Sequence, residues 1–171
     1  MVSCKQKETQ KTEIPEQKPT TELKVETKKK TEEIATPEQY FENDSLLSQL
    51  ESDLNKIALN SKFDLKTETK TNTHDETITD TINTLTFDKT KIYSYRATNG
   101  ESIYGAKIEN SDFIFLDSIR VGTKKATFEN LIKTEFKTDL FKIGNLEQTS
   151  IFVFNFENGI LKTINYESYL D

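Results

Sequence analysis

Residues 150–166, SIFVFNFENGILKTINY, predict a β-hairpin around which the domain is built. Asn158-Gly159 separates two segments rich in β-branched and aromatic residues, Ser150–Glu157 and Ile160–Tyr166. Asn-Gly is the strongest short-range hairpin signal, because both positions of the tight turn need positive φ. Since both faces are apolar, each should be covered by the rest of the domain or by a partner. Strict alternation assigns one face to Phe152, Phe154, Phe156 and Leu161, and the other to Ile151, Val153, Ile160, Ile164 and Tyr166.

A second Asn-Gly pair, Asn99-Gly100, predicts another hairpin, formed by residues 91–98 and 101–109. A two-residue loop places Tyr95 opposite Tyr104. Packing of their shared face into the core is the favoured interpretation. The alternatives are a partner-binding face, because exposed tyrosine is enriched at interfaces, and stacking on nucleotides, which would need a basic surround. The residues expected on this face are Tyr93, Tyr95, Ala97, Tyr104, Ala106 and Ile108.

Other segments also have the patterns of strands. Residues 62–72 alternate charged side chains with Phe, Leu and Thr, which is typical of a strand at a sheet edge. Residues 77–87 change phase, which indicates a bulge or bend near Asn83. Phe113-Ile114-Phe115-Leu116 is continuously apolar and is predicted to be a short central strand.

Two amphipathic helices are predicted from apolar residues spaced three and four apart. The first covers residues 45–58, with Asp44 or Ser45 as its N-cap. The second follows Gly122, with Thr123 as its N-cap, and its periodic pattern extends to Phe136. The sequence therefore predicts an α+β fold, a mainly antiparallel sheet with two helices, in a single domain at residues 40–171.

Residues 1–39 differ in composition from the rest of the chain. They hold all 3 prolines, whereas the 11 Phe and 6 Tyr lie from Tyr40 onward. The segment has as many Lys as Glu, so the remaining residues carry the whole net charge of −6. Its few apolar side chains cannot offset the entropy lost on ordering, about 1–2 kcal/mol per residue for the backbone. We predict a disordered tether; the alternative is a charged, solvated helix at Glu22–Glu33.

The composition also limits the chemistry. One Cys and one His exclude an intramolecular disulfide and a multi-histidine or cysteine-based zinc site. His74 is interpreted as an exposed loop residue, and the acidic stretch Asp75, Glu76, Asp80 and Asp88 as solvated, because it lacks calcium-loop spacing. The sequence holds no nucleotide-binding or nucleophile-elbow motif. We expect no catalytic residues, no metal, no cofactor and no nucleic-acid partner; an enzyme that uses loop carboxylates is the least favoured alternative.

Cys4 indicates where the protein resides. Val2-Ser3-Cys4 resembles the end of a bacterial lipobox, and mature lipoproteins of this type commonly carry a Lys/Glu/Thr/Pro-rich spacer after the cysteine. The resemblance implies a signal peptide upstream in the gene and a palmitate-containing lipid anchor on Cys4. It places the protein at a bacterial cell envelope, on the outer rather than the inner membrane, with its domain facing the periplasm or the surface. The alternative is an incidental free thiol.

A second resemblance covers Arg120–Tyr166. Val121-Gly122-Thr123-Lys124 is similar to the helix entry of SmpA/OmlA-type outer-membrane lipoproteins and of domains like the β-lactamase inhibitor protein. Phe156-Glu157-Asn158-Gly159-Ile160-Leu161 matches their closing hairpin. The long strands expected between residues 62 and 109 depart from the family pattern.

These observations favour a non-enzymatic, lipid-anchored protein whose domain binds another protein. Tyr93, Tyr95 and Tyr104 are the candidate partner-binding residues and Cys4 is the candidate lipidation site. The alternative function is an acidic, soluble inhibitor or immunity-type protein that blocks a basic partner enzyme, with association accelerated by its charge.

Overall fold

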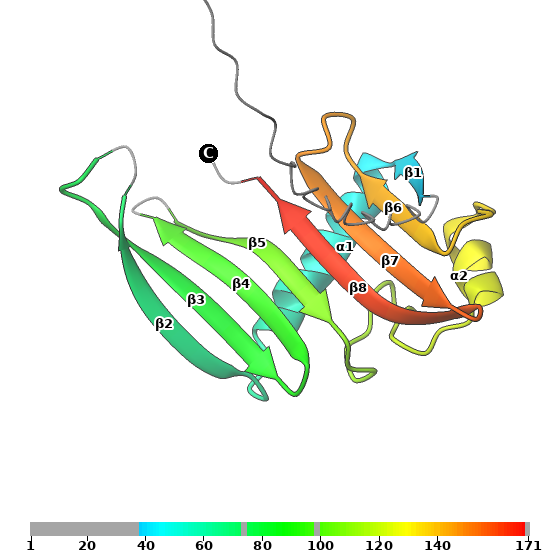
Figure 1. Cartoon of the computed structure of the whole chain (residues 1–171), viewed down its shortest axis with the longest axis horizontal. Coiled ribbons are helices and arrows are strands. Elements are labelled where there is room, and N and C mark those ends of the chain that lie inside the picture. Colours follow the sequence, from blue (N-terminus) through cyan, green and yellow to red (C-terminus); the bar gives the residue numbers. More distant parts are fainter. Residues whose placement is uncertain (1–37, 73–74, 98–99, 170–171) are drawn as a thin grey trace, which may run out of the picture. The chain divides into compact units, whose positions relative to one another are not determined.

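The computed structural model of the protein describes residues 38–72, 75–97 and 100–169. The strands in these residues form one 8-stranded sheet in the order β1-β6-β7-β8-β5-β4-β3-β2 (Figure 1). β1 pairs with β6 in parallel, and the other neighbouring pairs are antiparallel. The predicted α+β class is therefore confirmed. The elements are β1 Glu38–Glu42, α1 Asp44–Ala58, β2 Asp64–Thr71, β3 Thr79–Phe87, β4 Thr90–Ala97, β5 Gly100–Ile108, α2 Lys125–Ile132, β6 Leu140–Gly144, β7 Ser150–Glu157 and β8 Ile160–Ser168.

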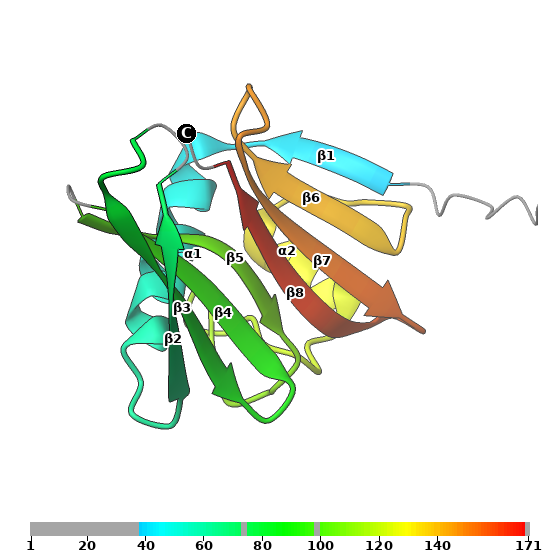
Figure 2. The same ribbon diagram turned by 60° about the vertical axis from the view of Figure 1, so that its left-hand side comes forward.

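Both helices pack on the same face of the sheet (Figures 1 and 2). α1 buries one apolar stripe, as its spacing predicts. Its N-cap is Asn43, whose side-chain oxygen accepts a 2.9 Å hydrogen bond from the N–H of Leu46. The predicted caps, Asp44 and Ser45, are wrong because Asn43 already satisfies this N–H from outside the helix. The buried stripe consists of Leu47, Leu50, Leu54 and Ile57.

α2 is shorter than its periodic pattern suggests. Its N-cap is Lys124, without a side-chain hydrogen bond, and the predicted cap Thr123 instead accepts a 3.0 Å hydrogen bond from the N–H of Arg120. The helix ends at Ile132, since Lys133 adopts a left-handed conformation with φ 55°. Apolar spacing beyond that point therefore belongs to a loop that still packs on the core.

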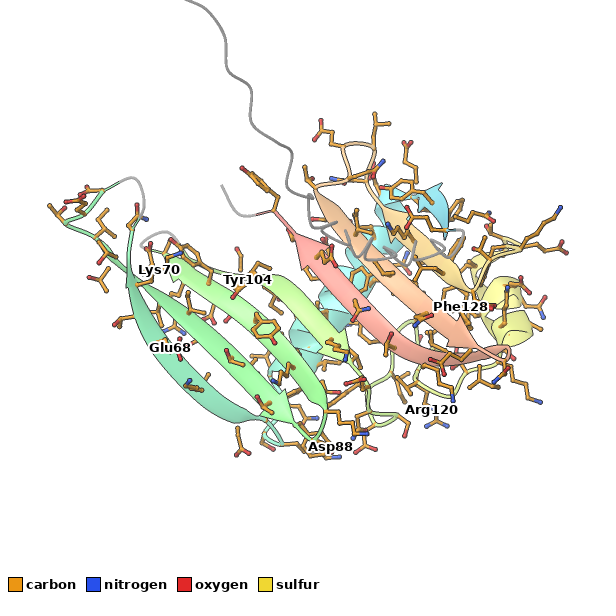
Figure 3. The ribbon with its side chains drawn as sticks, viewed as in Figure 1. Glu68, Lys70, Asp88, Tyr104, Arg120 and Phe128 are labelled. Atoms are coloured by element: carbon orange, nitrogen blue, oxygen red, sulfur yellow. The ribbon has the colours of Figure 1, made fainter. Side chains whose placement is uncertain are left out.

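Phe128 on α2, labelled in Figure 3, is the centre of an aromatic cluster with Phe136, Phe141, Phe154 and Phe156. It is fully buried, and its centroid lies 4.7 Å from that of Phe154. Phe136, from the loop after the helix, stacks on Phe141 at 4.3 Å. Ring pairs at these separations add about 0.5–1.5 kcal/mol each beyond simple burial. The cluster joins α2 to β6 and β7.

The β7–β8 hairpin is confirmed, with positive φ at Asn158 (52°) and Gly159 (71°). Its predicted face assignment holds as far as Leu161 and is wrong beyond it, because the register shifts between Asn155 and Phe156. The extra residue of this bulge inverts the face of the remaining β8 residues. Ile164 and Tyr166 therefore share the buried face with Phe152, Phe154, Phe156 and Leu161.

Of three other strand predictions, the structure confirms one. The edge strand at 62–72 is confirmed as β2, which ends the sheet and is exposed along its length. The bulge expected near Asn83 is wrong, because β3 pairs in unbroken register with both neighbours. Phe113–Leu116 is not a strand: it forms a loop with one isolated bridge, Phe115 to Ile119, and buries Phe113 and Phe115 from there.

The described residues belong to one compact unit, Ile34–Asp171. Its first strand, β1, starts at Glu38, two residues before the predicted domain start. The predicted tether lies, except for its last residues, outside the described residues, as do Cys4 and His74. Neither helix in the described part of the chain has the length and apolarity needed to span a membrane.

Candidate binding surface

The sheet face turned away from α1 and α2 is the open face, and the described residues place no helix over it (Figure 2). Tyr93 lies on this face, because its neighbours Ile92 and Ser94 are buried on the helix side. Residues paired across neighbouring strands share a face. Tyr93 pairs with Thr84 and with Gly105, so the open face continues across the sheet from β4 in both directions.

The predicted register of the β4–β5 hairpin is wrong. Ala97 pairs with Gly100, and Tyr95 pairs with Ser102 rather than with Tyr104. The register then shifts between Tyr93 and Ser94, which makes Tyr104 the extra residue of a bulge in β5. Because of this bulge Ala106 and Ile108 are buried on the helix side of the sheet. The sequence predicts them on the same face as Tyr93 and Tyr104, which lie on the open face instead.

The structure brings two of the three candidate tyrosines together. The ring centroids of Tyr93 and Tyr104 lie 6.0 Å apart, and both side chains are half-buried. Gly105 lies opposite Tyr93, and a Cβ there would be in van der Waals contact with Tyr93 Cδ2, at 3.4 Å. Burial, followed by the neighbouring Tyr93, raises the pKa of the Tyr104 hydroxyl. Figure 3 marks Tyr104 on β5. The favoured prediction, that these rings belong to the core, is wrong.

Tyr95 makes a different contact, since its hydroxyl donates a hydrogen bond to Asp80 Oδ2. Asn72 Nδ2 donates to the same oxygen at 2.7 Å. The hydrogen bond from Tyr95 to Asp80 raises the pKa of the tyrosine. Asp80 is only 1% exposed, so the interpretation of the acidic stretch as solvated is wrong at this position. The hydroxyl of Tyr95 is therefore engaged with Asp80 of β3, and it is less available to a partner than the hydroxyls of Tyr93 and Tyr104.

The charges of the open face nearly balance. Register and alternation place five lysines and six exposed carboxylates on it, although the domain as a whole is acidic. Two of these pairs are close: Lys142 Nζ lies 2.7 Å from Glu38 Oε2, and Lys66 Nζ lies 2.6 Å from Glu68 Oε1. Most of the acidic excess therefore belongs to the helix side and the loops. The charged residues of the open face are Lys66, Lys70, Lys91, Lys107 and Lys142 with Glu38, Glu42, Asp64, Glu68, Glu157 and Glu167.

On the helix side, Glu101 is the centre of a polar cluster. Its Oε1 accepts hydrogen bonds from Ser94 Oγ at 2.5 Å and Asn83 Nδ2 at 2.8 Å. Its Oε2 accepts from Arg96 Nη2 at 2.6 Å and Nε at 3.0 Å. These donors, Ser94 first, hold the pKa of Glu101 at about 2. The sequence contains a signal for the ion pair between Arg96 and Glu101, since residues of opposite charge flank the turn. The predicted register does not place these two residues opposite each other, so it does not reveal the pair.

A groove lies between α1 and the start of β5. Two cavities, of about 300 and 320 Å³, share Asn55, Glu101 and Ile103, and together form what we call the α1–β5 groove. One end is apolar, with Leu59 and Leu65 87% and 60% exposed at its rim. Sequence periodicity does not reveal this groove, because Leu59 follows the helix and Leu65 alternates like a core residue of β2.

The described residues contain no group of three or more His, Cys, Asp and Glu side chains that could hold a metal ion. Cys4, the candidate lipidation site, is outside these residues, so its role stays a prediction. The same holds for His74 and for the turn residue Asn99.

Comparison of the chain with protein-family models, with curated proteins and with solved structures finds no match. The resemblances to lipoproteins and to inhibitor-like domains therefore remain predictions from the sequence.

Proposed function

We propose that the domain is a non-enzymatic binding domain that holds another protein against its open face. We further propose that the chain is anchored to the outer membrane of a bacterial cell envelope through a lipid on Cys4. The observation that carries the first part is the half-buried Tyr93–Tyr104 ring pair on a face that no described helix covers.

Several properties of the open face support this function. Tyrosine combines a large apolar ring with a polar end, which suits a surface that is wet when free and buried when bound. Thr84 pairs with Tyr93, and charges of both signs occupy nearby positions of the same face, an arrangement similar to the polar rim of protein interfaces. Lys107 and Glu167 flank the pair on neighbouring strands, so a partner of mixed charge would find complementary groups. We therefore expect a folded protein partner with a flat, mixed-charge surface.

Site-specific photo-crosslinking in the native cell tests the binding face. A benzophenone side chain replaces Tyr104, and in a second variant it replaces Leu146, which is 71% exposed in the β6–β7 turn. We expect a discrete adduct from position 104 only, and competition by purified wild-type chain but not by a Tyr93→Ala chain. Equal adducts from both positions, or no adduct from position 104, would contradict the proposal.

Labelling with palmitate in the native cell tests the anchor. The wild-type chain should take up label and sediment with membranes, whereas Cys4→Ser should lose the label and become extractable without detergent. An unlabelled wild-type chain, together with a Cys4→Ser chain that stays on the membrane, would refute the lipid anchor.

The acidic inhibitor function is the second candidate. It is favoured by the distribution of charge, because most of the acidic excess lies off the open face, on the helix side and loops. A basic enzyme would then be steered to the helix side. An association rate that does not change with ionic strength would reject this candidate, whereas it is compatible with binding through the nearly charge-balanced open face.

A further inference from the structure

One strand inside the sheet has an open edge. β5 pairs with β4 from Lys107 to Gly100, apart from the bulge, but it pairs with β8 only over Gly105–Ile108. Gly100–Ile103 therefore have a strand partner on one side only among the described residues, and Tyr104 is the residue skipped by the bulge. Figure 1 shows β5 and β8 diverging at this point, with α1 behind the opening. In a strand paired on one side, alternate residues direct their N–H and C=O groups toward the unpaired side.

The open edge lies beside the α1–β5 groove. Glu101, Ser102 and Ile103 come from the unpaired half of β5 and line the cavity together with Leu54 and Asn55 of α1. The groove continues to the exposed Leu59 and Leu65. Free backbone groups and side-chain pockets are thus next to each other, which is the combination that strand-adding peptides use.

A carboxylate on α1 gives the groove a charge preference. Glu51 Oε1 accepts a 2.9 Å hydrogen bond from the Tyr166 hydroxyl, and no Lys or Arg among the described residues forms an ion pair with it. Glu101, by contrast, is already paired with Arg96. A cation that enters the groove would therefore interact with Glu51.

The β2 edge of the sheet is a less favourable place for an added strand. β2 exposes Lys66, Glu68 and Lys70 along its length, and charged side chains of this kind protect edges against pairing. The unpaired half of β5 carries Ser102 and Ile103 between Glu101 and Tyr104, and only Glu101 in it is charged.

We propose that the α1–β5 groove binds an extended segment of a partner protein, which adds as a strand to the open edge of β5. Its apolar side chains, at alternate positions, lie in the groove against Ile103 and Leu54, and a Lys or Arg between them pairs with Glu51. This site is separate from the Tyr93–Tyr104 pair and goes beyond the proposed function of the open face.

Nuclear magnetic resonance of the full chain with a synthetic peptide tests the proposal. The probe is an acetylated, amidated heptapeptide with Thr at odd positions, Val at 2 and 6 and Lys at 4. We expect amide shifts centred on Gly100–Tyr104 and on Glu51–Asn55, and none along β2 beyond Leu65, which lines the groove. Replacing the peptide Lys by Glu should weaken binding about fivefold, the size of a partly exposed ion pair, and N-methylation of alternate residues should abolish it.

Matched variants separate the contributions. Glu51→Gln should lose the preference for Lys over Glu in the peptide, whereas Glu147→Gln, the same charge change at an exposed turn, should keep it. Tyr93→Ala should bind the peptide like the wild type even if it fails on the open face. No shifts at millimolar peptide, shifts centred on β2, or equal binding of the N-methylated peptide would each overturn the proposal.

Discussion

Replacing Glu101 by Gln should destabilise the domain by about 1–2 kcal/mol at pH 7. Gln keeps one carbonyl oxygen for Ser94 and Asn83, but it loses the charge and turns amide hydrogens toward the Arg96 guanidinium. A pKa of about 2 against an ordinary value of 4.5 would correspond to about 3 kcal/mol for a buried group. Since the Glu101 side chain is 37% exposed, solvent screening reduces this to the smaller figure.

The loss should depend on pH, and its sign follows from the lowered pKa of Glu101. A carboxyl that is more acidic in the folded state stabilises it fully above the unfolded pKa of about 4.5. That contribution decreases as the pH falls toward 2, because the unfolded chain then binds the proton first. With the two pKa values above, about 40% of it should remain at pH 3. Urea unfolding of wild-type and Glu101→Gln chains at pH 7, 5 and 3 measures the difference.

Glu147→Gln is the matched control, because it removes the same charge from an exposed turn. Its free energy of unfolding should stay within about 0.5 kcal/mol of the wild type at each pH. The reasoning is refuted if Glu101→Gln behaves like this control, or if its destabilisation is the same at pH 3 as at pH 7.

Three further substitutions test the packing, and thermal or urea unfolding measures each. Phe128→Ala empties the centre of the aromatic cluster and should cost about 3–5 kcal/mol; a loss below 1 kcal/mol would contradict a fully packed site. Gly144→Ala should cost about 1–3 kcal/mol, since its Cβ would lie 2.5 Å from the Tyr40 hydroxyl and 2.7 Å from the Ser150 carbonyl oxygen, and neutral behaviour would exclude that close approach. Asn43→Ala removes the cap of α1 and should cost about 1 kcal/mol, whereas Asn43→Asp should retain most of the stability.

Sequence patterns predict the helices and strands that are determined by residues close to one another in the chain. In α1 apolar residues recur at helical spacing over four turns, and the β7–β8 hairpin has an Asn-Gly turn between alternating segments. Both elements could therefore be predicted. β1 was missed because five residues give little signal. Its place in the sheet depends on parallel pairing of Glu38 with Leu140, about a hundred residues away.

Core residues outside regular elements were harder to place. Phe113 and Phe115 are buried from a loop, with the chain turning at positive φ through Leu116 and Asp117. A run of apolar residues in a loop has the same composition as a buried strand, so periodicity cannot distinguish the loop from the strand. Asp80 is the opposite case, a charged residue buried on the open face because Tyr95 and Asn72 hydrogen-bond to it. Nothing in the acidic stretch distinguishes it from its solvated neighbours.

The predicted faces of both hairpins are partly wrong, including the surroundings of the candidate tyrosines, and one bulge in each hairpin accounts for this. Alternation assumes an unbroken ladder, so one extra residue inverts the face of everything beyond it. In β8 the inversion moves Ile164 and Tyr166 into the core, and in β5 it moves Ala106 and Ile108 there.

The inversion in β5 also determines which side chains lie on the open face. Ile92 and Ile108 are almost wholly buried on the helix side, and aliphatic side chains gain about 1.5–3 kcal/mol each from such burial. A buried tyrosine would in addition need a partner for its hydroxyl, at a cost of about 1–3 kcal/mol where none exists. Packing the isoleucines inward and leaving Tyr93 and Tyr104 half-exposed therefore satisfies both groups. The aromatic pair on the open face follows from core packing, and a partner that covers it would bury rings without disturbing the fold.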